Sequence, residues 1–117
     1  MDSRIRINLF HIFLVAPFLI WIGISRGNTP DSAFMVLLVL GIIVTLYHAY
    51  KSWIRLSANS SYVWVNLIHA LWIGPLLLYI GARKKDTGRP YFELLLLTAF
   101  GALGYHLYEL VTHYDLL

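Results

Sequence analysis

Cysteine is absent from this chain of 117 residues, and charged residues are scarce. The absence of cysteine excludes disulfides, iron–sulfur clusters, thiolate zinc sites and thiol catalysis. Asp, Glu, Lys and Arg together make up 13% of the residues, against roughly 25% in typical soluble domains. The nine basic residues form no run that alternates with aromatic residues, so we expect no nucleic-acid partner.

Hydrophobic residues make up 59% of the chain, and its mean hydropathy is +0.68. A soluble monomer of this size would need more charge to cover its surface. The apolar residues form four stretches, at about residues 8–25, 33–50, 62–82 and 92–112. At ~1.5 Å per residue, each stretch is long enough to cross the ~30 Å hydrocarbon layer as a helix. We therefore predict an all-α polytopic integral membrane protein with four transmembrane helices.

Pro17 and Pro75 lie inside the first and third predicted spans. A proline removes one backbone hydrogen bond, which a membrane helix tolerates at the cost of a kink. We predict paired helix kinks at these residues, which would widen a helix bundle towards one side. Ordinary packing without such widening is the alternative.

The chain contains an internal repeat. A shift of 58 residues aligns the two halves without a gap and gives identical residues at 14 of the 43 positions from 8 to 50. The matches include Asn8 with Asn66, His11 with His69, Pro17 with Pro75 and His48 with His106. We predict a duplication in which residues 1–58 and 59–117 are two transmembrane hairpins of one structural unit. Both hairpins would enter the membrane from the same side and pair about a pseudo-two-fold axis along the membrane normal, as an antiparallel four-helix bundle.

The matched positions also predict which helix faces turn inward. In the first span they are Asn8, His11, Leu19 and Ile22, with Val15 similar in both halves, and this spacing follows one stripe of a helix. In the fourth span, small residues would allow a close approach of helix backbones. These small residues are Ala99, Gly101, Ala102 and Gly104.

The candidate functional residues are the four repeated histidines, His11, His48, His69 and His106. An antiparallel hairpin brings the histidines of one half to the same membrane side at similar depth, and the duplication adds the other two. We therefore predict one layer of four imidazoles near one membrane face. The polar neighbours expected to orient them are Asn8, Asn66, Tyr47, Tyr50, Tyr105 and Tyr108.

Such a layer has three interpretations. It binds or relays a small cation, a proton or a transition metal, because neutral imidazole ligates metals and titrates near neutral pH. Alternatively, the imidazoles only satisfy hydrogen bonds in a structural or accessory subunit of a larger membrane assembly. The third interpretation is a bis-histidine haem electron carrier, for example with His48 and His106 as ligands, although four large side chains at one level leave little room for a porphyrin. The spans contain no recognised catalytic motif, so the sequence favours a function other than catalysis.

The remaining charges bear on pairing and orientation. Lys51 and Glu109 occupy equivalent places in the two halves, and we predict an ion pair between them; two charges that reach the interface separately are the alternative. The hairpin loops 26–32 and 83–91 carry five basic residues, against four at the opposite ends of the spans. This slight excess favours cytoplasmic loops, with both termini on the opposite side. The expected partners are the lipid bilayer and either further copies of this chain or other subunits of a membrane assembly.

Overall fold

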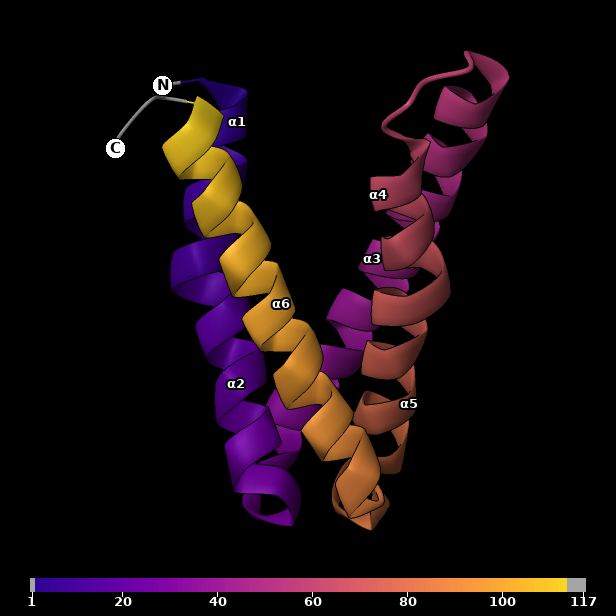
Figure 1. Ribbon diagram of the computed structural model, residues 1–117. Helices are drawn as coiled ribbons and strands as arrows, with labels where there is room; N and C mark the ends of the chain where they lie inside the picture. The colour runs from indigo at the N-terminus through magenta and orange to yellow at the C-terminus, as the bar shows by residue number, and fades with distance from the viewer. Residues whose placement is uncertain (1, 114–117) are drawn as a thin grey trace. The chain divides into compact units, whose positions relative to one another are not determined.

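A computed structural model describes residues 2–113 of the chain (Figure 1). These residues are 91% helical and contain no strand. In chain order the elements are α1 (Ser3–Phe10), η1 (His11–Val15), α2 (Ala16–Ser25), η2 (Arg26–Asn28), α3 (Asp31–Ser57), α4 (Val63–Ile68), η3 (His69–Ile73), α5 (Gly74–Arg83), η4 (Lys84–Asp86) and α6 (Arg89–His113). The segments η1 and η3 are π-helical, whereas η2 and η4 are 3₁₀ turns. Met1 and residues 114–117, which belong to the predicted hairpins, lie outside the described residues.

Four continuous helical segments are long and apolar enough to cross a membrane. They are Ser3–Asn28, Asp31–Ser57, Val63–Asp86 and Arg89–His113. Each overlaps one predicted span, so the prediction of four long apolar helices is confirmed, and the chain is compatible with a multi-pass membrane protein. The first helix begins before its apolar stretch because the Asp2 carboxylate caps it, accepting a hydrogen bond from the Arg4 amide at 2.7 Å.

Large apolar side chains are widely exposed along the helices. Leu71, Phe13 and Trp53 are 75%, 70% and 73% exposed. In water, such surface costs about 25 cal/mol per Å² relative to an apolar environment. Hydrocarbon removes that cost, so these side chains suit a lipid environment.

The chain divides into two compact units, and the first contains residues 1–26 and 92–117. In it, α1, η1 and α2 lie alongside α6 (Figure 1). The pairing is antiparallel, because Asn8 near the start of the chain bonds to His106, whereas Gly23 lies against Leu96. A Cβ atom at Gly23 would lie 2.6 Å from Leu96 Cγ.

The second unit contains residues 27–91, in which α3 packs antiparallel against α4, η3 and α5. Glycines bring its helix backbones together, among them Gly81, Gly41 and Gly74. A Cβ atom at Gly81 would lie 2.6 Å from the Leu38 backbone nitrogen, and one at Gly41 would lie 2.7 Å from the Leu78 backbone nitrogen. Glycine at these positions therefore sets how closely α3 and α5 approach.

The buried face of the first helix differs from the predicted stripe. Ile12 and Ala16 are buried, whereas His11 and Val15, which were predicted on the inward stripe, are only half-buried. The reason is the π-helical segment His11–Val15, which holds more residues per turn than an α-helix and so rotates the stripe.

The close approach that small residues of the fourth helix would allow is not seen at two of its glycines among the described residues. A Cβ atom at Gly101 or Gly104 would meet nothing within 4 Å among the described residues. Ala99 of the same set is fully buried, and Gly101 follows it by two residues, which turns it about 200° around the helix. Close approaches occur instead where glycine shares the buried face.

The burial pattern is nearly the same at positions 58 residues apart. Buried residues of the first helix are Asn8, Ile12, Ala16, Leu19, Ile22 and Gly23, and their counterparts Asn66, Ala70, Gly74, Leu77, Ile80 and Gly81 are buried in the third, where Leu76 is buried in addition. Each compact unit combines one helix from the first predicted hairpin with one from the second. The duplication, its boundary at residue 58 and the four-helix bundle stay predictions.

Candidate functional site

The first unit pairs two of the predicted histidines. The rings of His11 and His106 stack with their centroids 4.2 Å apart and their planes inclined by 16°. His106 Nδ1 lies 2.8 Å from Asn8 Oδ1, across the contact between α1 and α6. His11 Nδ1 lies 2.8 Å from the carbonyl oxygen of Ile7, one turn earlier on its own helix. We call His11, His106 and Asn8 the first histidine site.

The second unit repeats this arrangement with the other two histidines. The rings of His48 and His69 stack with their centroids 4.3 Å apart and their planes inclined by 22°. His48 Nδ1 lies 2.9 Å from Asn66 Oδ1, and His69 Nδ1 lies 2.7 Å from the carbonyl oxygen of Val65. We call His48, His69 and Asn66 the second histidine site. Each partner corresponds to its counterpart in the first site by a shift of 58 residues.

The oxygen partners determine which ring nitrogen carries the proton. Carbonyl and amide oxygens only accept hydrogen bonds, so all four Nδ1 atoms donate. A neutral imidazole has one N–H group, and Nε2 is therefore the nitrogen with the lone pair. Histidines that bind a proton or a metal through Nε2 are commonly held in this tautomer by a hydrogen bond from Nδ1. Every histidine of the two sites is thus oriented as a base.

Asparagine is the buried polar residue of each site. Asn8 is 1% exposed and Asn66 is 3% exposed, and each presents its Oδ1 to a histidine. Neither Nδ2 atom has a hydrogen-bond partner in the described part of the chain. Each buried amide holds its histidine in a defined orientation through the hydrogen bond at Oδ1. Burial of the unpaired Nδ2 group costs free energy. The predicted role of these asparagines beside the histidines agrees with this geometry.

A π-helical turn begins at one histidine of each site. The amide of Ala16 bonds to the carbonyl of His11, and the amide of Gly74 bonds to the carbonyl of His69, each across five residues. Pro17 and Pro75 follow immediately. Because a proline supplies no amide hydrogen, a wide turn before it accommodates the missing bond. The predicted kinks themselves stay predictions.

The predicted tyrosines lie further from the hydrogen-bonded groups. Tyr47 meets the ring of His48 edge-on at 5.1 Å, and Tyr105 meets that of His106 at 5.2 Å, as neighbours along one helix. Tyr50 and Tyr108 are 63% and 69% exposed, which places them at the surface. Asn66 and Asn8 make side-chain bonds to His48 and His106.

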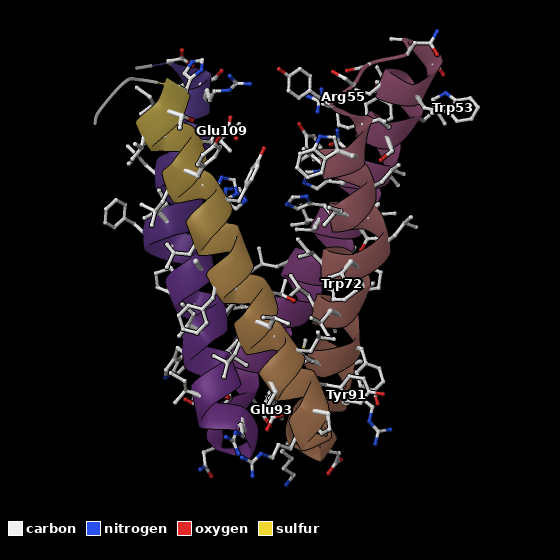
Figure 2. All side chains as sticks on the ribbon, viewed as in Figure 1. Trp53, Arg55, Trp72, Tyr91, Glu93 and Glu109 are labelled. Atoms are coloured by element: carbon white, nitrogen blue, oxygen red, sulfur yellow. The ribbon has the colours of Figure 1, made fainter. Side chains whose placement is uncertain are left out.

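Glu109 forms an ion pair with Arg4 that was not predicted from the sequence. In the first unit, Arg4 Nε lies 2.9 Å from Glu109 Oε1, and the same guanidinium reaches His113 Nδ1 at 3.0 Å. Glu109 lies near the C-terminal end of α6 (Figure 2). Lys51 belongs to the second unit, so the predicted Lys51–Glu109 pair stays a prediction. Arg4 lies four residues before Asn8, which places it on the same face of the first helix, one turn nearer the N-terminus.

The described residues contain no group of three or more His, Cys, Asp or Glu side chains arranged to hold a metal ion. Two imidazoles that bind one tetrahedral metal ion keep their ligating nitrogens about 3.3 Å apart, with the plane of each ring directed at the metal. In each site the rings instead stack face to face. The geometry within one unit therefore does not resemble bis-histidine ligation of a metal or haem. Whether all four imidazoles share one layer, as predicted, involves both units and stays a prediction.

Comparisons of this chain with protein-family models, with curated proteins and with solved structures found no match. The function is therefore argued from the two histidine sites and the helices that carry them.

Proposed function

We propose that the chain is a multi-pass membrane protein that takes up and relays protons at its two histidine sites. The observation that carries this proposal is the shared hydrogen bonding of the four imidazoles. Each Nδ1 donates to an oxygen atom, which puts the lone pair of the neutral ring on Nε2. Imidazole is the side chain whose charge ordinarily changes between pH 5 and 8.

A proton suits these sites better than a transition metal. Structural metal sites need about four ligands and catalytic ones about three, whereas each histidine site supplies two imidazoles. A proton needs one lone pair, which the Nε2 atom of a single imidazole supplies. The sequence left open a small cation, a proton or a transition metal, and we therefore propose the proton.

The stacking sets how many protons each site holds. Two imidazolium charges 4.2 Å apart in the first site would repel by about 4 kcal/mol at an effective dielectric constant of 20. One imidazolium stacked on one neutral imidazole avoids this repulsion. We therefore expect each histidine site to hold at most one proton.

Two other functions make different predictions. In a structural subunit, the His106–Asn8 and His48–Asn66 bonds serve only to join helices, and the imidazoles do not exchange protons. In a haem carrier, His48 and His106 come from different units and the purified protein absorbs strongly in the Soret region. Both alternatives are outcomes of the experiment below.

The experiment compares proton flux into liposomes that contain the wild type, the double variant His11→Gln/His69→Gln, or His113→Gln. The double variant removes one base from each site and retains both histidine–asparagine bonds. His113 is a matched control, since it is the one described histidine outside the two sites. A pH-sensitive dye inside the liposomes reports the flux driven by an imposed potassium gradient with valinomycin.

We expect the double variant to lose at least about tenfold in flux and His113→Gln to equal the wild type. Nitrogen-15 NMR of labelled histidines should show at most one proton taken up per site between pH 5 and 8. The proposal is overturned if wild-type liposomes conduct no faster than protein-free liposomes and the four imidazoles do not titrate. A Soret band that disappears in His48→Gln would replace it with the haem function.

A further inference from the structure

Two basic residues end helices in a backbone conformation that favours glycine. Lys84 follows α5 with φ 53° and ψ −131°, and Arg26 follows α2 with φ 50° and ψ −127°. They are 58 residues apart in the sequence. A positive φ crowds the Cβ atom of any residue except glycine, so each long side chain is kept at a conformational cost.

The helix dipole does not explain why a basic residue occupies a strained position. Positive charge stabilises a helix C-terminus from any position in its last turn. Arg83 already supplies such a charge in an ordinary helical conformation, with φ −80°. The chain therefore gains nothing for helix α5 by placing a second basic residue in the strained position. A ligand for the Lys84 side chain would explain why the position is not glycine.

The segment around Lys84 is strongly basic. Within the second unit it carries Arg83, Lys84, Lys85 and Arg89, with Asp86 as its one acidic residue. The Arg83 guanidinium donates to the backbone oxygen of Asp86 at 3.4 Å and lies 5.9 Å from the centre of the Tyr79 ring. These contacts hold Arg83 in place without neutralising it. In Figure 2, Tyr91 marks this end of the second unit, and Trp53 and Arg55 mark its other end.

The equivalent position in the first unit has an unsatisfied donor. Arg26 Nε is buried and has no hydrogen-bond partner in the part of the chain that the structure describes. A buried guanidinium nitrogen without an acceptor is costly, and guanidinium groups bind phosphate and carboxylate groups through paired hydrogen bonds. The strain and the donor thus point to the same class of ligand.

We propose that the strained basic residues Lys84 and Arg26 each bind a phosphate ester, supplied by the headgroup of an anionic phospholipid. Both residues lie at the ends of candidate spans, Val63–Asp86 and Ser3–Asn28, and the ends of transmembrane helices lie level with lipid headgroups. Basic residues next to a span attract anionic lipids. In the second unit this site is at the opposite end of α5 from His69, so it does not depend on proton relay.

The test uses the full chain in phosphatidylcholine vesicles with and without a minority of phosphatidylglycerol. Lys84→Gly and Arg26→Gly remove the side chain and relieve the backbone strain, so misfolding does not explain a loss of binding. Lys85→Ala removes an equal charge from the same segment, and Lys51→Ala removes one from α3. Electron paramagnetic resonance of spin-labelled phosphatidylglycerol gives its association relative to phosphatidylcholine, and thermal unfolding gives the stability.

We expect about fivefold weaker association of phosphatidylglycerol for each glycine variant, together with a higher melting temperature in phosphatidylcholine alone. The two alanine variants should lose less. Equal losses for Lys84→Gly and Lys85→Ala would show diffuse attraction and overturn the proposal, as would unchanged association in both glycine variants. Inorganic phosphate, added without anionic lipid, distinguishes the sources: if it stabilises the wild type but not Lys84→Gly, the site takes free phosphate, and if it has no effect while phosphatidylglycerol does, the ligand is the lipid headgroup.

Discussion

Replacing Gly81 by alanine tests how the second unit is held together. A Cβ atom there would lie 2.6 Å from the backbone nitrogen and 2.7 Å from the Cα of Leu38. Ordinary contacts between carbon atoms are about 3.5–4.0 Å, so α3 and α5 must move apart by about 1 Å. Backbone atoms cannot rotate away as a side chain does. The substitution therefore acts on the separation of the two helices.

Two further glycines give a graded series. At Gly23, the equivalent position of the first unit, the added Cβ would meet the Leu96 side chain at 2.6 Å, and a leucine can change its rotamer. At Gly101 it would meet nothing within 4 Å among the described residues. All three changes gain about 1 kcal/mol from the higher helix propensity of alanine, so that gain cancels between variants. Overpacking should make Gly81→Ala less stable than Gly101→Ala by about 1–3 kcal/mol, with Gly23→Ala between them.

The measurement is unfolding of each purified variant in mixed micelles, titrated with sodium dodecyl sulfate and followed by tryptophan fluorescence. The expected order of stability is Gly101→Ala, then Gly23→Ala, then Gly81→Ala. Equal stability of Gly81→Ala and Gly101→Ala would refute the reasoning, because it would mean that the α3–α5 contact is not set by backbone approach.

Three other substitutions have defined outcomes in the same unfolding assay. Asn66→Ala removes the acceptor of the His48 Nδ1 hydrogen bond and should cost about 1–2 kcal/mol; no loss would mean that this bond does not join α3 to α4. Thr45→Val removes a buried hydroxyl that has no hydrogen-bond partner among the described residues and should stabilise the chain by about 1 kcal/mol, whereas a loss would reveal a partner. Arg4→Ala breaks an ion pair with Glu109 whose side chains are 41% and 23% exposed. Its cost should stay below about 1 kcal/mol and vanish at high salt, and a larger, salt-independent loss would contradict a surface pair.

Much of the helical layout was predictable because it follows from hydropathy. In lipid, a chain segment must make its backbone hydrogen bonds internally, so about 18 consecutive apolar residues predict a helix. The asparagine partners of the histidines were also accessible, since Asn8 and Asn66 lie on the matched stripe with Leu19 and Leu77. The π-helical turn at His11 was not, because proline predicts a disturbed helix without saying how the missing hydrogen bond is replaced.

Hydropathy does not determine which helices pack against each other. His11 and His48 follow one another in the first half, yet the rings that stack are His11 on His106 and His48 on His69. An apolar pattern gives the face that each helix buries and no information on which helix covers it. For the same reason the Arg4–Glu109 ion pair was not predicted from the sequence.

The two histidine sites also differ in when they can be completed during synthesis. His48 and Asn66 are 18 residues apart, whereas His106 and Asn8 are 98 apart. All residues of the second site have been synthesised once α4 and η3 have left the ribosome. Asn8 of the first site lacks its partner until His106, in the second half of α6, has been synthesised. In the membrane that we propose for this chain, α1 would carry Asn8 without its histidine during that interval, and an unpaired amide is costly in lipid. We expect the first helix to be the last to reach its final packing.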